Sequence, residues 1–278
     1  MSARFQDKVV FITGASSGLG AAMAEEFARE GARLVLAARR ADRLDAVKSK
    51  IEGLGRPVLT VTCDVTDRAQ LDAAVAEAVA EFGGLDVVVA NAGFGVSGTA
   101  TRLETEHFRR QFETNVFGVV DTIYATLPHL QASKGRLALV SSVMGRVGLP
   151  ASGPYCASKF AVTGLAECFY YDLADLGVSV TSINPGVVAS EIRTLNNRGE
   201  QTGRKDPVSP WLIMPTEKAA RKMVGAIYRR TPEFTFTGHG VLVAFLCRHF
   251  PRSFRCLVRF FTKGKLAKVE ELKRGKGE

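Results

Sequence analysis

The chain has 278 residues, of which 46% are hydrophobic and 23% are charged, so it contains enough apolar material to bury a sizeable core. Its formal net charge is +9, but residues 229–278 hold 12 Lys and Arg against 4 Asp and Glu, which leaves only +1 for the first 228 residues. Because the basic residues gather in the tail and no recognition motif accompanies them, a nucleic-acid-binding protein is not expected.

The N-terminus and the cysteines predict a protein kept on the cytosolic side of the membrane. Residues 1–8 are mixed in charge, and the apolar run that follows leads into glycines without a cleavage site. No apolar run approaches the roughly 18 residues that are needed to span a bilayer. The five cysteines show no C-x-x-C spacing and no partner histidines at ligand spacing. We therefore expect reduced thiols, with neither a disulfide framework nor a metal site.

The first predicted unit is a strand, a glycine-rich turn and a helix. The strand covers Val9–Thr13, the glycine segment follows, and the helix covers Leu19–Glu30. In this context Gly14 would make the tight turn, Gly18 would let the backbone approach a phosphate, and Gly20 would let helix and strand pack closely. The helix N-terminus would then face a pyrophosphate with free N–H groups. The alternative for an isolated glycine cluster is a flexible turn.

The alternation of strands and helices continues through the first half of the chain. Strands are predicted at Arg33–Ala38, Val58–Cys63 and Leu85–Ala90, and helices at Asp42–Leu54 and Ala69–Phe82. Nearly continuous Val, Ile and Leu strands between amphipathic helices indicate an α/β protein with a parallel sheet covered on both faces. Such doubly wound sheets bind ligands beyond the carboxyl ends of their strands.

The second half repeats the pattern and then ends in an extension. Strands are predicted at Arg136–Ser141 and Val178–Ile183, and helices at Thr105–Leu130, from the Tyr155 region to Leu176 with Gly177 as its cap, and at Thr216–Arg229. A short apolar segment, Glu233–Thr237, follows the last of these helices. Residues 191–215 are polar and broken by Gly and Pro, which predicts a mobile substrate loop. We expect one catalytic domain over residues 1–240 and a basic amphipathic extension over 241–278.

Tyr155 and Lys159 carry the clearest chemical signal. Four residues apart, they share one face of the predicted helix, and Ser142 precedes the tyrosine by thirteen residues. A free tyrosine has a pKa near 10, so a nearby cation is needed before its phenolate is stabilised. Lys159 could supply that cation, and Ser142 could hold a carbonyl or hydroxyl that exchanges a proton with Tyr155. The alternative is a surface pair of the kind that occurs by chance in many helices.

Several motifs in the same order give the chain a strong resemblance to the short-chain dehydrogenase/reductase family, over roughly residues 5–240. The motifs are Thr13-Gly14-x-x-x-Gly18-x-Gly20, Asp64, Asn91-Ala92-Gly93, Asn115, Ser142, Tyr155-x-x-x-Lys159 and Pro185-Gly186. The resemblance implies a single Rossmann-like domain and a reaction that transfers hydride between a nicotinamide and a carbonyl/alcohol pair. It makes Tyr155 the general acid/base, Ser142 the group that orients the substrate oxygen, and Lys159 the group that lowers the tyrosine pKa and holds the ribose.

The resemblance also assigns a water-holding role in a proton relay to Asn115, which would otherwise be an unfavourable residue inside a helix. The residues expected to bind the cofactor are Gly14, Ser16, Ser17, Gly18, Leu19, Gly20, Arg39, Arg40, Asp64, Val65, Asn91, Ala92, Gly93, Tyr155, Lys159, Pro185, Gly186, Val188 and Ser190. Asp64 would bond the adenine, although it could instead cap the next helix. Ser190 stands where the family usually has threonine, and it keeps the hydroxyl for the nicotinamide amide.

The end of the second strand predicts the choice of cofactor. NAD-binding proteins of this kind need an acid there for the ribose hydroxyls. This chain has Arg39 and Arg40 instead, with no acid before Asp42. Because arginine binds a 2′-phosphate with two charged hydrogen bonds while an acid would repel it, NADP(H) is favoured.

The substrate is expected to meet residues 94–100, 143–154 and 191–215. The middle segment offers Val143, Met144, Val147, Leu149 and Pro150, with Arg146 as its one charge. This wall predicts an apolar carbonyl or alcohol such as a lipid, steroid or retinoid, unless the same residues simply pack the loop. The rival interpretations are a nucleotide-binding regulator that has lost catalysis, and a change of reaction to epimerase or dehydratase. Neither is favoured, because the catalytic set is intact and those enzymes have longer chains with a differently spaced glycine motif.

Two surfaces predict contacts beyond the substrate. Family resemblance implies a homo-oligomer paired through the two long helices. Phe108, Phe112, Val116, Val119 and Ile123 form an apolar stripe on the first, unless that stripe packs on the sheet, and Phe169 and Tyr170 add aromatic side chains on the second. After Pro251, the residues Phe254, Leu257, Val258 and Phe261 recur at helical spacing, with Arg252, Arg255, Arg259 and Lys263 on the other side. This pattern is typical of a helix lying on a membrane surface, and its alternative is packing on the domain or on a partner subunit.

Overall fold

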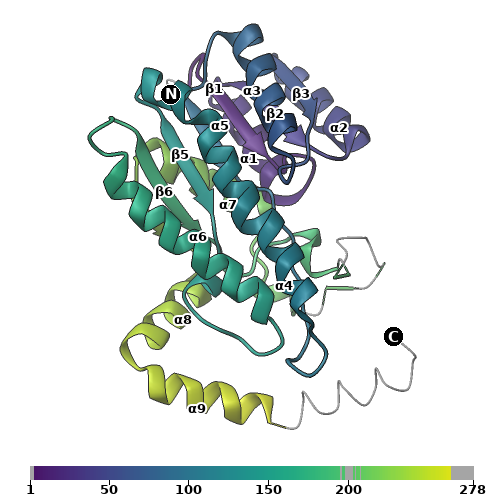
Figure 1. Ribbon diagram of the computed structural model, residues 1–278, viewed down its shortest axis with the longest axis vertical. Helices are drawn as coiled ribbons and strands as arrows, with labels where there is room; N and C mark the ends of the chain where they lie inside the picture. The colour runs from purple at the N-terminus through teal and green to yellow at the C-terminus, as the bar shows by residue number, and fades with distance from the viewer. Residues whose placement is uncertain (1–2, 195, 198–202, 204, 207, 264–278) are drawn as a thin grey trace.

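The computed structural model describes residues 3–194, 196–197, 203, 205–206 and 208–263 (Figure 1). Its centre is a seven-stranded sheet in the order β3-β2-β1-β4-β5-β6-β7, in which every neighbouring pair is parallel. The strands are β1 Val9–Thr13, β2 Arg33–Ala38, β3 Val58–Thr62, β4 Val87–Ala90, β5 Arg136–Val140, β6 Ser179–Asn184 and β7 Glu233–Thr235. The expected α/β class with a parallel sheet is confirmed.

Helices cover both faces of the sheet, because successive strand residues point to opposite sides. The helices are α1 Gly18–Arg29, α2 Ala41–Glu52, α3 Arg68–Phe82, α4 Thr105–Phe112, α5 Gly118–Ser133, α6 Gly153–Asp172, α7 Thr216–Tyr228, α8 Gly238–His249 and α9 Pro251–Thr262. Ile12 packs with α1, α2 and α7 in one apolar cluster, and the adjacent Phe11 packs with α3, α5 and α6 in the other. This is the doubly wound arrangement that the alternation predicted (Figure 1).

The strand order reverses next to β1, which pairs with β2 on one side and with β4 on the other. The loops that leave β1 and β4 therefore diverge and open a crevice at the carboxyl edge of the sheet. Since all strands are parallel, the segments that follow β2, β3, β5 and β6 reach the same edge. The fold thus brings the glycine segment, Asn91, Ser142 and Pro185 to one end of the molecule.

The predicted elements agree with the observed bounds to within two residues, apart from the two long helices. The helix predicted over Thr105–Leu130 is divided by a π-helical turn, η1, at Glu113–Phe117. The helix predicted to reach Leu176 ends at Asp172, with Leu173 as its cap residue. Gly177 does adopt a left-handed φ of 76°, but it closes the turns that follow the helix. The expectation that Gly177 caps α6 is therefore wrong.

The described part of the segment 191–215 contains two short 3-10 helices, η3 Glu191–Arg193 and η4 Pro210–Leu212. Arg193 binds both carboxylate oxygens of Asp206, which ties the two halves of the segment together. Residues 195, 198–202, 204 and 207 lie outside the described residues, so the mobility of this loop stays a prediction. Residues 264–278 of the basic extension also lie outside them. Among the described helices, none is long and apolar enough to cross a membrane.

Candidate active site

The glycine turn after β1 fits closely against the loop after β4. Gly14 has a left-handed φ of 65°, and a Cβ atom on it would lie 2.8 Å from the Cα of Ala92. A Cβ on Gly20 would collide with the carbonyl oxygen of Gly14, so helix and turn approach as closely as the sequence predicted. The hydroxyl of Thr13 accepts hydrogen bonds from the backbone N–H groups of Asn91 and Ala92 at 3.1 and 3.2 Å. The two sides of the crevice are therefore held at a fixed spacing.

The N-terminus of α1 fits a phosphate group. Ser17 is its N-cap residue, yet within the described chain its side chain makes no capping hydrogen bond to the helix. Its hydroxyl accepts instead from the guanidinium of Arg40 at 2.8 Å, and Ser16 accepts from the same group at 3.2 Å. The first N–H groups of the helix are thus left for an anion, as a dinucleotide pyrophosphate requires. Gly18 has a left-handed φ of 55° at the start of this helix, next to Leu19.

Three arginines gather at the carboxyl end of β2. Arg40 contacts the glycine turn, Arg39 lies 3.7 Å from Asp64, and Arg43 binds Glu191 at 2.6 Å. Arg40 also pairs with Glu191 at 3.5 Å. Burial raises the pKa of the Glu191 carboxyl, but the hydrogen bonds and charges of Arg43 and Arg40 outweigh burial and hold that pKa below its usual value. The cluster has the charge and the donors that a 2′-phosphate needs.

Asp64 follows the end of β3 by two residues and does not cap α3. Its carboxylate accepts from the N–H and the hydroxyl of Thr66 at 3.0 and 2.9 Å. Asp67 is the N-cap residue, because it accepts from the N–H groups of Ala69 and Gln70. The capping alternative for Asp64 is therefore wrong, and Asp64 stands at the sheet edge beside the buried Val65. Its adenine-binding role stays a prediction.

Ser142 and the segment after β6 meet at the next part of the edge. The Ser142 hydroxyl accepts from the N–H of Met144 at 3.1 Å and donates to the carbonyl of Pro185 at 3.4 Å. The N–H of Val143 also donates to Pro185. These bonds fix the serine at the mouth of the crevice, 8% exposed.

Tyr155 and Lys159 lie on α6, where Lys159 is 4% exposed. The lysine ammonium donates to the carbonyl of Val140 at 2.8 Å and lies 5.8 Å from the centre of the Tyr155 ring. Burial lowers the pKa of Lys159 to about 8. Burial raises the pKa of Tyr155, and the Ser142 hydroxyl only partly opposes this rise. The tyrosine pKa thus moves opposite to the direction expected from the lysine alone, because removal from water outweighs the favourable contacts.

The π-helical turn places Asn115 against the loop after β4. Asn115 is fully buried, accepts from the N–H of Phe94, and donates to the Phe94 carbonyl and to the Ser158 hydroxyl, at 3.0, 3.0 and 3.2 Å. Gln111, one turn earlier, binds the same loop through Phe94 and Val96 at 2.7 and 2.6 Å. Gly93 lies in this corner, where an added Cβ would be 3.0 Å from Asn115 Oδ1 and 3.7 Å from Lys159 Nζ. The interior asparagine therefore has a structural reason to be there.

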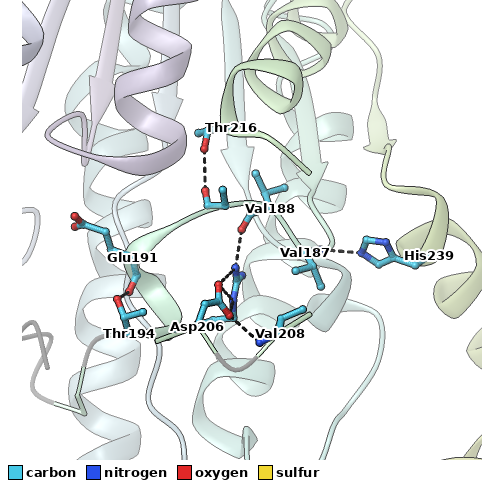
Figure 2. A network of polar contacts seen from close by, with 10 residues as sticks. Val187, Val188, Glu191, Thr194, Asp206, Val208, Thr216 and His239 are labelled. Carbon is cyan, nitrogen blue, oxygen red and sulfur yellow. Dashed lines mark hydrogen bonds and ion pairs between the residues drawn. The ribbon is translucent and has the colours of Figure 1, made fainter. Parts of the chain in front are cut away.

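The segment after Pro185 and Gly186 is held by bonds to the C-terminal part of the chain. Val187 donates its N–H to His239 at 3.0 Å, and Ala189 accepts from the hydroxyl of Thr216 at 3.0 Å (Figure 2). Val188 is buried, and Ser190 is the N-cap residue of η3. Ser190, which is expected to contact the nicotinamide amide, is followed directly by Glu191, which pairs with Arg40 and Arg43.

The three segments expected to surround the substrate do come together. A Cβ on Gly95 would lie 3.6 Å from both Tyr155 and Ile192, so one glycine faces the tyrosine and the loop 191–215. The backbone N–H of Ser97 donates to the side-chain oxygen of Asn197 at 2.9 Å, and the side-chain amide of Asn197 donates to the carbonyl of Ser97 at 3.0 Å. The backbone of Gly98 bonds to Ala151.

Fewer residues of segment 143–154 are available to a substrate than the sequence predicted. Val143 and Val147 are 6% and 2% exposed and pack against Phe254 of α9, so the packing alternative holds for these two. Arg146 pairs with Glu233 at 2.6 Å. Met144 and Leu149 remain partly exposed.

Several residues of the site were not found from the sequence. Arg43 and Glu191 are 148 positions apart, and no local pattern joins them. Gln111 could have been noticed, since it is a polar residue one helical turn before Asn115. Within the described residues, no group of His, Cys, Asp or Glu is arranged to hold a metal ion.

Comparison with known proteins agrees with this geometry. The family model described as short chain dehydrogenase matches residues 8–201. The chain belongs to the short-chain dehydrogenase/reductase family. Members of this family are oxidoreductases that bind a nicotinamide cofactor. The glycine turn, the uncapped start of α1 and the glycine corner at Lys159 fit such a cofactor.

Three relatives illustrate the similarity. An uncharacterized oxidoreductase of Myxococcus xanthus is 40% identical over 191 residues, which cover 68% of this chain and 76% of that protein. The glycine betaine reductase ATRR of Emericella nidulans is 35% identical over 227 residues, or 81% of this chain, but the chain spans only 18% of its length. The solved alcohol dehydrogenase of Thermococcus sibiricus, complexed with 5-hydroxy-NADP, has a TM-score of 0.73 at 28% identity and covers 83% of this chain and 96% of its own.

Proposed function

We propose that this protein is an NADPH-dependent reductase of apolar ketones or aldehydes, with Tyr155 as the general acid. The observation that carries the proposal is the meeting of Ser142, Tyr155 and Lys159 at the carboxyl edge of the sheet, beside the glycine turn of β1. The catalytic set is intact, which argues against a binding protein that has lost its chemistry.

The side chains have distinct parts in the reaction. The bound nicotinamide supplies the hydride. Ser142 orients the substrate oxygen and polarises it by donating a hydrogen bond, and the Tyr155 hydroxyl transfers its proton to that oxygen. Lys159 holds the ribose and stabilises the negative charge left on Tyr155, because a cation close to a phenolate in a site with little water has a large effect. Asn115 positions the Phe94 loop and Ser158 next to this centre.

The raised pKa of Tyr155 supports the direction of reduction. A phenol that keeps its proton at neutral pH is ready to act as an acid, whereas oxidation of an alcohol needs the phenolate as a base. Burial is the cause of the rise. The proposed direction, from carbonyl to alcohol, is the one that a protonated phenol suits.

Two observations support NADPH over NADH. Arg40 binds the serines of the glycine turn, and Arg39 and Arg43 lie near it in the sequence. This group of guanidinium donors suits a 2′-phosphate. The Thermococcus sibiricus enzyme, which shares the fold, was solved with an NADP derivative. An apolar substrate is supported by Met144 and Leu149, which are partly exposed after β5, and by Ile192, which faces Gly95 together with Tyr155.

A screen that follows the loss of NADPH absorbance in the presence of a library of ketones and aldehydes tests the function. We expect turnover with apolar members of the library, and a smaller effect when NADH replaces NADPH. Binding of NADPH without turnover of any carbonyl or alcohol would instead favour a nucleotide-binding regulator. Failure of NADPH to bind would contradict both.

We further propose that the protein is a homo-oligomer paired through α5 and α6. Val116, Val119 and Ile123 of the predicted stripe are buried, so the packing alternative holds for these three, whereas Phe108 and Tyr170 of the predicted surface are exposed. Large side chains on η1, α5 and α6 are 41–66% exposed: Phe117, Tyr124, Phe160, Tyr170 and Tyr171. Light scattering should give a mass at least twice that of one chain, and a monomer mass at micromolar concentration would contradict the pairing.

A further inference from the structure

Helices α8 and α9 form an arm at one end of the molecule, away from the centre of the sheet (Figure 1). This C-terminal arm, residues 238–263, is anchored along one side. Phe254 is 9% exposed and forms an apolar cluster with Val143 and Val147 of the loop after β5, to which Val243, Leu246, Cys247 and Val258 also contribute. The stripe predicted from the sequence is therefore divided, since Phe254 and Val258 pack on the domain while Leu257 and Phe261 do not.

Both helices of the C-terminal arm also carry large apolar side chains in contact with solvent. Six of them are between 48% and 75% exposed: Leu242, Phe245, Phe250, Leu257, Phe260 and Phe261. Single exposed apolar residues are common on protein surfaces, but a group of this size on two successive helices is typical of an interaction surface.

The charges of the C-terminal arm all have one sign. It contains Arg248, Arg252, Arg255, Arg259 and Lys263, all of them exposed, and the sequence has no Asp or Glu between Glu233 and Glu270. In the part of the chain that the structure describes, none of these five cations lies in an ion pair. The surface therefore combines exposed aromatic rings with uncompensated positive charge.

Exposed aromatic rings together with unpaired positive charges favour a lipid surface over a second copy of this chain as the partner. A second copy placed symmetrically on the surface would bring five cations against five cations, which opposes association. An anionic lipid headgroup layer has the opposite charge, and the hydrocarbon beneath it accepts aromatic and leucine side chains. We propose that the C-terminal arm docks on the surface of an anionic lipid bilayer, with Phe260 and its exposed neighbours inserted and the basic residues against the headgroups.

The C-terminal arm is also fastened to the walls of the cleft. Val143 in its cluster follows Ser142 directly, and His239 at the start of α8 accepts the hydrogen bond from Val187 (Figure 2). A Cβ on Gly240 would lie 2.8 Å from the side chain of Val143. If the proposed function is right, which the docking itself does not require, an apolar carbonyl dissolved in lipid would enter the cleft from the docked side.

Co-sedimentation of the full chain with vesicles tests the docking. The vesicles consist of phosphatidylcholine alone or of phosphatidylcholine with roughly one-third phosphatidylserine. We expect strong binding only with phosphatidylserine, and weaker binding as salt is added. Because each basic residue near an anionic leaflet contributes roughly a fivefold gain in partitioning, the triple variant Arg252→Gln, Arg255→Gln and Arg259→Gln should lose on the order of 100-fold.

A matched triple variant on α7 controls for net charge. Lys218→Gln, Arg221→Gln and Lys222→Gln remove three exposed cations from α7, a helix that packs in the cluster of α1 and the sheet instead of the cluster that anchors the C-terminal arm. This variant should bind the vesicles nearly as well as the natural chain. Insertion is followed with Phe260→Trp in a Trp211→Phe background, which leaves one tryptophan in the chain. Its fluorescence should shift to shorter wavelength when phosphatidylserine vesicles are added.

Three results would overturn the docking. They are recovery of the natural chain in the supernatant with phosphatidylserine at low salt, equal losses in the two triple variants, and an unshifted tryptophan spectrum. Thermal unfolding of both triple variants, which needs no enzyme assay, checks that they are folded. Docking without NADPH-dependent turnover would refute only the proposed function, and turnover without docking would refute only this inference.

Discussion

Two positively charged regions lie on the same edge of the sheet, and they differ in their exposure to water. Lys159 is 4% exposed and contacts one backbone carbonyl, whereas the side chains of Arg40 and Arg39 are 40% and 65% exposed. In the buried region one cation acts on one phenol through a medium of low dielectric constant. In the exposed region several arginines share one ligand, and water screens each of them. Single substitutions should therefore have large effects at Tyr155 and Lys159 and graded effects among the arginines.

The largest effect is expected from Tyr155→Phe. This change keeps the ring and removes the proton that is transferred, so kcat should fall by roughly 10²–10⁴-fold, the range typical of an acid/base group. Binding of NADPH, measured by its fluorescence, should stay close to that of the natural protein. A Phe variant with near-normal kcat would show that the proton comes from another group.

Lys159→Met should lower kcat almost as much as Tyr155→Phe. The same change should stabilise the cofactor-free protein against unfolding at neutral pH. The pKa of Lys159 falls from 10.5 in the unfolded chain to about 8 in the folded protein. Below pH 8 the buried charge therefore costs about 3 kcal/mol of folding free energy, which is the net difference between the charged and the neutral form. Since the folded state binds fewer protons than the unfolded chain, the stability of the natural protein should rise between about pH 8 and pH 10.5.

The Met variant should lack that rise when unfolding is followed in denaturant. The rate of reduction by the natural protein should fall as pH passes about 8, because neutral Lys159 no longer stabilises the tyrosinate. A stability difference that did not change over this pH range would contradict the buried charge.

Arg40→Ala should raise the KM for NADPH about tenfold, because a charged hydrogen bond to the 2′-phosphate is lost from a partly exposed site. The KM for NADH should change little. Arg39→Ala, the change that the sequence alone suggested, should have the smaller effect, since Arg39 lies toward Asp64. Equal effects of the two variants on both cofactors would show that the arginine cluster does not bind the phosphate.

Glu191→Gln gives the smallest expected effect and tests the exposed arginine cluster alone, without the buried Lys159. Its carboxylate pairs with Arg40 and Arg43, so it competes with a 2′-phosphate for both guanidinium groups. Removal of the charge should tighten NADPH binding roughly two- to fivefold, the scale of an exposed ion pair, and leave NADH binding unchanged. Weaker NADPH binding in this variant would show that Glu191 supports the cofactor site instead of competing with it.

The sequence predicted those features that neighbouring residues in the chain determine. The strands Val9–Thr13 and Arg33–Ala38 were predicted to the residue, because buried parallel strands are continuous apolar runs between turn residues. The residues at the carboxyl edge followed from the motifs and from the parallel order of the strands. Their roles in catalysis and cofactor binding stay predictions for the experiments above to test.

The missed features depend on contacts between distant segments. The π-helical turn at Asn115 has the same apolar spacing as an α-helix, and it is fixed by Phe94 on another loop. The raised pKa of Tyr155 depends on burial, which the pattern Tyr-x-x-x-Lys does not report. The amphipathic stretch after Pro251 was visible, but the division of its apolar face between domain and solvent depends on where Val143 and Val147 lie.

The most direct test of the central claim is a single-turnover reaction with NADPH that carries deuterium at the reactive C4 position, once a carbonyl substrate has been found. We expect deuterium on the carbinol carbon of the product with the natural protein, and a rate lower by roughly 10²–10⁴-fold with Tyr155→Phe at saturating NADPH. Product without deuterium, or a Phe variant that reacts at the natural rate, would contradict it.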